Sequence, residues 1–315
     1  MKKIWKYLQS YFKEEVKPAY FITILLMVAA LVYLEYTYDM EKTYVTVHFW
    51  NTPVHFAASF IQYSIPFLGS YILYIIFYKR WDVAKNPAFW GTLVVALAIF
   101  AFRSSWFDYR HWVQKLSDPE SYYYNMRCTN QIAQGMLIFT PCTLFWLFFN
   151  RKLMPLYGFK IRGVDLQPYL IMLLGMVPLV AWASFQGDFL RTYPMYGKII
   201  PEGFTTMKSS LKIIFFELCY GFDFVMTEFF FRGFLILAFA RFVGRGCIMP
   251  MVAFYVVIHF GKPLGETISS FFGGLILGVI AYETRSIIGG IIAHLGVAWM
   301  METGGTFGRG LDLAK

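Results

Sequence analysis

The chain has 315 residues, of which 58% are hydrophobic and 15% are charged, and its formal net charge is +9. Soluble domains carry about 25% charged residues, so this composition excludes an ordinary soluble globular protein and favours one that crosses a membrane several times. In a soluble chain a charge of +9 would suggest nucleic-acid binding, but here the Lys and Arg residues flank apolar runs. That pattern is typical of membrane orientation. We therefore expect membrane lipids as partners and no nucleic acid.

The hydropathy pattern predicts an all-α protein, a polytopic membrane bundle of about eight to nine transmembrane helices. Nine apolar stretches are expected to span the membrane, at 20–36, 55–78, 88–102, 132–149, 169–185, 213–240, 247–259, 267–282 and 287–301. If the N-terminus is inside the cell, the inside segments carry more Lys and Arg than the outside ones. This asymmetry favours a cytoplasmic N-terminus.

We divide the chain into four parts. Residues 1–19 are basic and amphipathic, which indicates a juxtamembrane segment that lies on anionic headgroups. Residues 20–209 contain transmembrane helices without a recognised motif, whereas residues 210–302 form a core that carries motifs. Residues 303–315 are expected to be a loose tail.

Two ionisable side chains interrupt the apolar stretch that runs from Met226 to Gly233, namely Glu228 and Arg232. On an α-helix this spacing of four residues places both groups on one face, close enough to pair. Inside a bilayer each such charge costs about 2.5–3.5 kcal/mol. An ionisable residue at that depth therefore indicates a functional site.

Two histidines are expected at a depth similar to that of Glu228. At ~1.5 Å per helical residue, Glu228 is about 20 Å from the charged turn that follows its helix. By the same rise, His259 and His294 are about 21 Å and about 14 Å from the charged turns that precede their helices. These turns all belong to one membrane face, so the three side chains are expected to converge on a common cavity inside the bundle.

One carboxylate and two imidazoles inside a membrane suit two kinds of chemistry. They can bind a divalent metal such as zinc and leave one position open for water. Alternatively, the carboxylate acts as a general base on water while the histidines polarise a carbonyl group and stabilise the oxyanion. A third interpretation is that these groups only form hydrogen bonds between helices.

Three short patterns resemble the motifs of the CPBP family of membrane proteins. They are Glu228-Phe-Phe-Phe-Arg232-Gly233, Tyr255-Val-Val-Ile-His259 and His294. The family's motifs are Glu-Glu-x-x-x-Arg, an aromatic residue followed four positions later by His, and His-x-x-x-Asn or Asp. The family comprises type II CAAX prenyl endopeptidases, bacteriocin-processing enzymes and Abi-type proteins. The resemblance implies an intramembrane endopeptidase, described both as a metalloprotease and as a glutamate-dependent protease.

The resemblance also implies site residues, a substrate and a location. Glu228, His259 and His294 would be catalytic, with Arg232 as the structural partner of Glu228. The same carboxylate and histidines would hold zinc or another divalent metal if the enzyme uses one. The substrate would be a prenylated, bacteriocin-like or otherwise membrane-associated peptide, and the location would be the bacterial plasma membrane.

Two positions depart from the family's pattern. Thr227 replaces the first glutamate, which is generally assigned to activating water, and Ala298 replaces the final Asn or Asp. Asp223, one turn before Thr227, is a candidate substitute carboxylate, while a Glu228 clamped by Arg232 would be a weaker base. Three functions stay open: an active endopeptidase; a catalytically silent relative that acts as a scaffold, immunity factor or peptide binder; and a transporter, which the lack of internal repeats disfavours.

Overall fold

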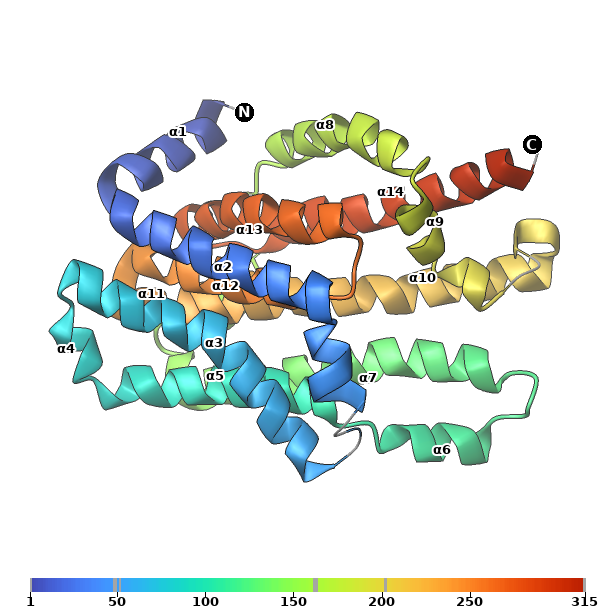
Figure 1. Cartoon of the computed structure of the whole chain (residues 1–315), viewed down its shortest axis with the longest axis horizontal. Coiled ribbons are helices and arrows are strands. Elements are labelled where there is room, and N and C mark those ends of the chain that lie inside the picture. The colour runs from blue at the N-terminus through green and yellow to red at the C-terminus, as the bar shows by residue number, and fades with distance from the viewer. Residues whose placement is uncertain (1, 48–49, 51, 161–163, 201–202, 314–315) are drawn as a thin grey trace. The chain divides into compact units, whose positions relative to one another are not determined.

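The structure is a computed structural model that describes residues 2–47, 50, 52–160, 164–200 and 203–313 (Figure 1). The described residues form helices and no β-strand, which confirms the predicted all-α class. The α-helices are α1 (Lys2–Ser10), α2 (Pro18–Tyr38), α3 (Pro53–Tyr78), α4 (Trp81–Ala84), α5 (Pro87–Ser105), α6 (Tyr109–Leu116), α7 (Tyr122–Phe145), α8 (Gln167–Ala183), α9 (Gly187–Thr192), α10 (Met207–Glu228), α11 (Ala240–Val243), α12 (Ile248–Val257), α13 (Leu264–Thr284) and α14 (Ile288–Leu313).

Among the described residues, 6 helical segments are long and apolar enough to cross a membrane, which fits an integral membrane protein. They are Pro18–Tyr38, Pro53–Tyr78, Pro87–Leu116, Tyr122–Asn150, Met207–Val257 and Leu264–Thr284. The fifth segment covers the expected span 213–240 and most of the expected span 247–259. Gly244 interrupts the helix between these two spans, and its φ of 58° is a conformation that favours glycine. Helix α8 is apolar but shorter, and α14 is not among the six. The count of eight to nine transmembrane helices stays a prediction.

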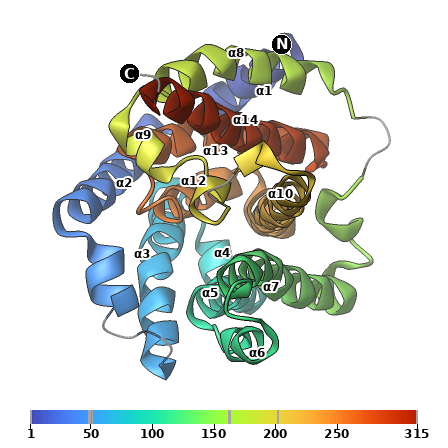
Figure 2. The same ribbon diagram turned by 90° about the vertical axis from the view of Figure 1, so that its right-hand side faces the viewer.

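By its internal contacts the chain divides into two compact units, and each is described by itself. The first unit comprises residues 1–106, 137–162 and 229–288. Its central helix is α12, because every residue of that helix is buried. A helix that is apolar on all sides needs a covering on all sides. Helices α2, α3 and α13 and the π-helix η7 (Phe229–Ala238) supply contacts to α12, and Figure 2 shows α3 and α13 next to it.

Aromatic rings fill the space around α12 in the first unit. The ring of Phe254 lies between 5.1 and 6.2 Å from the rings of several neighbours, namely Tyr63, Phe67, Phe100, Phe230 and Phe231. Such pairs contribute about 0.5–1.5 kcal/mol each beyond the area they bury. The unusual phenylalanine content of the sequence therefore serves, in this unit, to build one continuous core.

The second unit comprises residues 107–136, 163–228 and 289–315, and within it α10 lies beside α14. The two helices approach closely at Gly221, where a Cβ atom would lie 3.1 Å from the side chain of Leu295. Several glycines of α14 face α8 in the same way, namely Gly289, Gly296 and Gly304, while Gly308 faces Ser184 and Leu190 beyond the end of α8. Small residues at such positions let helix backbones come close together.

The segment 303–315 differs from its expected structure. It was expected to be a loose tail, yet α14 continues as far as Leu313. Two long-range contacts hold this end of the helix: Arg309 donates to the carbonyl of Leu190 at 2.8 Å, and the hydroxyls of Thr306 and Tyr196 lie 2.8 Å apart. Residues 314–315 lie outside the described part of the chain.

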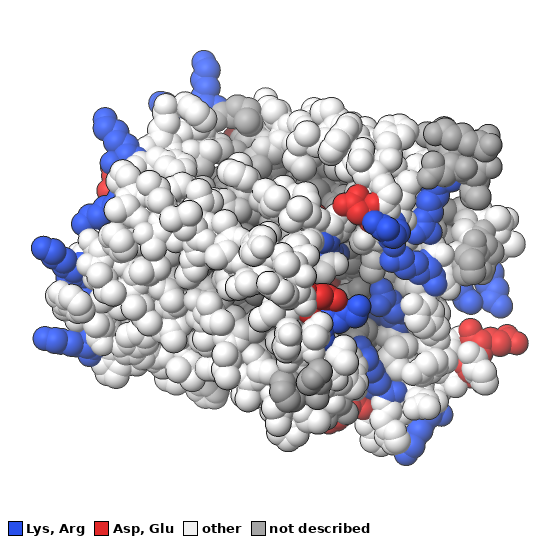
Figure 3. Space-filling model, in the orientation of Figure 1, with Lys and Arg blue, Asp and Glu red and all other residues white. Residues whose placement is uncertain are grey.

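Basic side chains of the first unit gather away from its apolar surface. In Figure 3, Lys and Arg side chains stand at the left-hand edge, where α1 and α4 lie, beside a broad surface without charged side chains. Helix α1 itself is amphipathic, since Ile4 is buried whereas Lys2, Lys3 and Lys6 are exposed. Basic side chains at the edge of a broad apolar surface are typical of a protein that crosses a bilayer.

We expect the stability of the protein to depend on pH through the carboxyl group of Glu41. It begins the short π-helix Glu41–Val47, outside the candidate spans, and burial raises its pKa to about 7, helped by the nearby Glu35 and opposed by a hydrogen bond from Gln62. A raised carboxyl pKa means that the folded state holds the proton more tightly than the unfolded state. The free energy of unfolding should therefore be highest below about pH 4.5 and fall by at most about 3 kcal/mol as pH rises through 7.

Thermal unfolding midpoints in detergent at pH 5 and pH 8 check this expectation. The parent should be less stable at pH 8, and Glu41→Gln should reduce the difference. Glu120→Gln, which changes an exposed carboxylate, serves as the control. An identical pH dependence in the parent and Glu41→Gln would contradict the assignment to Glu41.

Candidate functional site

The first motif lies where one helix type replaces another. Helix α10 ends at Glu228, and the π-helix η7 begins at Phe229 with all of its residues buried. Both Glu228 and Arg232 have 0% exposure. A π-helix forms i→i+5 hydrogen bonds and is frequent at functional sites. The prediction that an α-helical spacing aligns these two groups therefore needs correction, and their pairing stays a prediction.

Glu228 contacts the histidine of the third motif. Its Oε1 atom lies 2.9 Å from Nδ1 of His294, and both residues belong to the second unit. With Glu228 ionised, the Nδ1–H group of His294 donates the hydrogen bond to the carboxylate, and Nε2 of the neutral ring holds the lone pair. The ring of Phe224 packs edge-on against the imidazole at 4.7 Å. This bond places two of the predicted site residues together.

Space for the buried carboxylate depends on a glycine. A Cβ atom at Gly290 would lie 2.6 Å from Oε2 of Glu228. Helix α14 therefore presents bare backbone to the carboxylate one turn before His294, and any other residue at this position would push the carboxylate away. The close approach of α10 to α14 at this point is thus built into the sequence.

Arg232 and His259 share one aromatic neighbour in the first unit. The guanidinium group of Arg232 stacks over the ring of Tyr255 at 4.0 Å from its centroid. The imidazole of His259 packs against the same ring at 4.6 Å. A cation over an aromatic face is attracted by the ring quadrupole, an interaction worth about 2 kcal/mol when desolvated. Tyr255 therefore joins the arginine of the first motif to the histidine of the second.

His259 lies in the turn that follows α12, not in the helix, because α12 ends at Val257. Its Nδ1 atom lies 2.8 Å from the carbonyl of Tyr255. A carbonyl oxygen only accepts, so Nδ1 carries the proton and the neutral ring keeps its lone pair on Nε2. Both histidines of the motifs thus use Nδ1 for a hydrogen bond within the protein.

The turn with His259 is held by groups from α13 and α2. The hydroxyl of Thr267 donates to the carbonyl of His259 at 2.7 Å. The hydroxyl of Tyr36 lies 2.7 Å from the hydroxyl of Thr267 and also contacts the carbonyl of Lys262. An N-terminal helix without any recognised motif therefore helps to hold the turn that carries a motif histidine.

The structure places the remaining predicted residues on the same helices. Asp223 is half-buried on α10, and Thr227 is buried one turn later. Ala298 is buried on α14, one turn after His294. Glu228 and His294 are brought together, whereas the convergence of His259 with them, and the substitute role of Asp223, stay predictions.

The described side chains do not form a metal site with several ligands. No group of three or more His, Cys, Asp or Glu side chains lies close enough within the described part of the chain to hold a metal ion. A catalytic zinc takes three protein ligands, so the described groupings do not fit one. The metal role of Glu228, His259 and His294 stays a prediction, and no step of the mechanism below passes through a metal.

The part of the chain that carries the motifs is similar to a known protein family. Residues 209–300 match the family Type II CAAX prenyl endopeptidase Rce1-like. The match confirms the resemblance that the three motifs indicated, and it covers the same part of the chain. No curated protein and no solved structure matches the chain. Tyr36 lies outside the Rce1-like segment, whereas Tyr255 and Thr267 lie inside it.

Three supporting residues were not assigned a role from the sequence. The motif pattern contained Tyr255 as the aromatic residue before His259, and its spacing of four was the signal that both rings share a helix face. Thr267 and Tyr36 carried no such signal, because their contacts with the turn depend on tertiary packing. The hydroxyl of Tyr36 and the carbonyl of Lys262 belong to residues 226 positions apart.

Arg232 should stabilise the fold more than an exposed arginine does. Arg232→Ala removes a fully buried guanidinium from the face of Tyr255, so we expect a loss of about 2 kcal/mol or more in the free energy of unfolding. Arg151→Ala, at an exposed position, is the control and should change stability by within about 0.5 kcal/mol. Thermal unfolding in detergent measures both. An Arg232→Ala protein as stable as the parent would exclude this role.

Proposed function

We propose that the protein is an intramembrane endopeptidase of the CAAX protease type, and that it hydrolyses a peptide bond in a lipid-modified or otherwise membrane-associated peptide. The observation that carries the proposal is the buried hydrogen bond between Glu228 and His294 at 2.9 Å. A carboxylate that orients an imidazole is the arrangement by which many enzymes prepare a general base. The match over residues 209–300 supports the peptidase class.

The pair suggests a mechanism in which His294 is the base and Glu228 orients it. Nε2 of His294 takes a proton from water as the water oxygen attacks the carbonyl carbon of the scissile bond. Glu228 stabilises the imidazolium that forms, in the way an aspartate serves the histidine of a catalytic triad. The proton then passes to the leaving nitrogen as the C–N bond breaks, which yields a carboxylic acid and an amine.

This assignment accounts for the loss of the family's first glutamate. Thr227 has no acidic group that could act as a base near neutral pH, but a base on α14 does not require one on α10. The three-motif pattern adds His259, which in its protonated form would donate Nε2–H to the oxyanion. Its Nδ1–H is already donated to the carbonyl of Tyr255, so the ring is held in one orientation.

A catalytically silent relative is the second candidate function. It is favoured by the two departures from the family's pattern, Thr227 and Ala298, which remove two polar groups. In that case the same buried residues would serve only to hold α10 and α14 together. The protein would then act as a scaffold, an immunity factor or a peptide binder.

A cleavage assay with farnesylated and unmodified peptide libraries separates the two candidates. The parent should cleave, and His294→Ala and Glu228→Gln should each lower kcat/KM by about 10²–10⁴-fold, the usual contribution of a positioned base. Thr227→Glu should add little, because a second carboxylate beside Glu228 disturbs the site. His111→Ala and Glu120→Gln, at exposed positions, are matched controls.

Two results would contradict the proposal. One would exclude an active enzyme, and the other would exclude His294 with Glu228 as its base. Inactive parent protein together with strong activity in Thr227→Glu would show that the base was lost and support the silent relative. Parent activity that survives both His294→Ala and Glu228→Gln would exclude this pair as the catalytic base. Metal content of purified parent and of a His259→Ala, His294→Ala double variant tests the predicted zinc separately.

We expect the hydroxyls of Tyr36 and Thr267 to help position His259. Tyr36→Phe and Thr267→Val each remove a hydroxyl that contacts the turn with His259. Each change should cost the free energy of one hydrogen bond, about 0.5–1.5 kcal/mol. We expect kcat to fall about 2- to 10-fold with KM unchanged, since the contact lies behind the histidine. Tyr33→Phe, on the same helix and 65% exposed, is the control. A change in KM alone would contradict a positioning role.

A further inference from the structure

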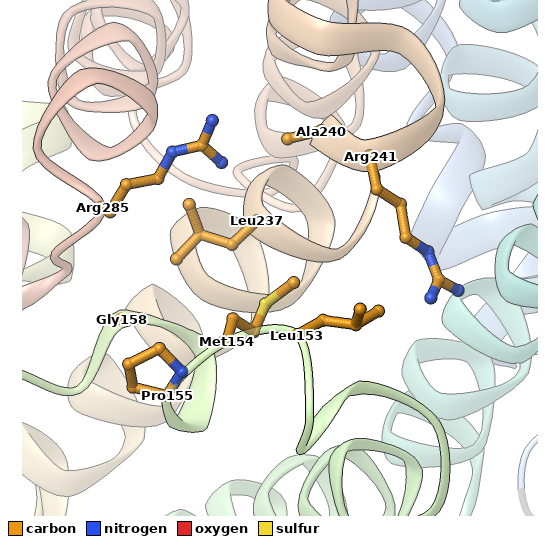
Figure 4. A pocket seen from close by; sticks show the side chains of 8 residues that line it. All are labelled: Leu153, Met154, Pro155, Gly158, Leu237, Ala240, Arg241 and Arg285. Atoms are coloured by element: carbon orange, nitrogen blue, oxygen red, sulfur yellow. The ribbon is translucent and has the colours of Figure 1, made fainter.

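A cavity in the first unit is not used by the proposed reaction. Its volume is about 460 Å³ and its lining residues are Leu153, Met154, Pro155, Gly158, Leu237, Ala240, Arg241 and Arg285. Figure 4 shows the apolar side chains between the two arginines, which stand on opposite sides. The volume lies within the range of about 300–1,000 Å³ that is usual for ligand sites. The lining combines an apolar floor with two cationic groups.

The wall of the cavity is fixed by hydrogen bonds, so the cavity is formed in advance. The backbone N–H of Ile287 donates to the carbonyl of Gly158 at 3.1 Å, and Ser286 donates to the carbonyl of Lys160 at 3.1 Å. Gly158 has a φ of +75°, and a Cβ atom there would lie 2.7 Å from the side chain of Leu237. Only glycine lets this loop lie against η7.

The floor of the cavity is held in a similar way. Trp146 donates its indole N–H to the carbonyl of Met154 at 2.9 Å, and Asn150 donates to the hydroxyl of Tyr157 at 2.9 Å. These bonds tie the loop of residues 151–158 to the π-helix Trp146–Asn150, which directly follows α7. A site with a fixed wall and floor loses little entropy when a ligand binds.

Neither arginine of the cavity is neutralised by a carboxylate. Among the described residues Arg241 and Arg285 form no ion pair, and each guanidinium instead lies over a ring, that of Phe242 at 4.4 Å and that of Tyr282 at 4.6 Å. Both side chains are exposed. By contrast, Arg245 pairs with Glu14 and Glu283 at 2.9 and 2.7 Å. The cavity therefore keeps two positive charges that are available to an anion.

The cavity lies at the charged end of three membrane helices. The loop after α7, the turn after η7 and the turn after α13 all follow spans that the charge pattern directs to the cytoplasmic face. Their meeting in one cavity agrees with a shared membrane face. Anionic lipid headgroups are concentrated at that surface, and basic pockets between membrane helices bind them.

We propose that this cavity binds one anionic phospholipid. Arg241 and Arg285 hold its phosphate through charge-assisted hydrogen bonds, and Leu237, Met154 and Leu153 contact its glycerol and the start of its acyl chains. An amphiphile matches both parts of the lining, whereas a free phosphate would leave the apolar floor in water. The site is separate from the proposed peptidase residues and does not depend on their activity.

Lipid binding to the purified full chain in detergent tests the proposal. Native mass spectrometry with titrated phosphatidylglycerol and phosphatidylcholine of identical acyl chains gives the affinity for each lipid. We expect the parent to prefer phosphatidylglycerol. The double variant Arg241→Gln with Arg285→Gln should bind phosphatidylglycerol roughly 10- to 30-fold more weakly, because each basic residue contributes ~1 kcal/mol to the binding free energy. Ala240→Phe should also weaken binding, because it fills the cavity and keeps both charges.

Controls separate the cavity from general surface charge. Lys79→Gln with Lys85→Gln removes two exposed charges from the same unit without touching the cavity and should leave phosphatidylglycerol binding unchanged. The lysines of α1 remain in every sample. Equal affinity for both lipids, an equal loss in the Lys79 and Lys85 control, or full competition by inorganic phosphate at a comparable concentration would each overturn the proposal.

Discussion

A guanidinium group without exposed surface needs compensation inside the protein, because a bare charge in an apolar interior costs more than the whole stability of a typical fold. Arg232 has 0% exposure and lies over the face of Tyr255 at 4.0 Å. Tyr255 belongs to α12, the helix that is buried on every side and around which the aromatic core of the first unit is built. The position of this one ring therefore couples the first motif to the second, and any change that moves α12 also moves one of the groups that lie against the guanidinium.

The two motif histidines both use Nδ1 for a hydrogen bond, but with different partners. His294 donates Nδ1–H to a buried carboxylate, and His259 donates Nδ1–H to the carbonyl of a residue one turn earlier. Each bond holds its ring in one orientation, and a ring that is neutral keeps its lone pair on Nε2. The carboxylate beside His294 would stabilise a positive charge on that ring, as the proposed base requires. This difference is the reason to assign the base to His294 and the polarising role to His259.

Part of this arrangement was predictable from the sequence, because helical rise is constant and charged turns mark the ends of membrane helices. The depth estimate placed Glu228 and His294 at one level, and their hydrogen bond confirms it for that pair. The π-helix after Glu228 was not predictable from local spacing. Nor was the ordered end of α14, where Gly304 and Gly308 allow close packing against the end of α8 and the residues that follow it. In both cases the outcome depends on contacts between distant segments, which local patterns do not record.

The match to known proteins covers residues 209–300, yet the candidate functional site and the separate cavity both depend on chain outside it. Tyr36 on α2 supports the turn with His259, and the loop of residues 151–158 completes the cavity with Arg241 and Arg285. The segment with the motifs contains the candidate site residues but not all of the groups that hold them. Helices without motifs therefore do more than anchor the chain in a membrane. Since contacts of this kind are made by single hydroxyls and backbone carbonyls, they leave no pattern that a motif search detects.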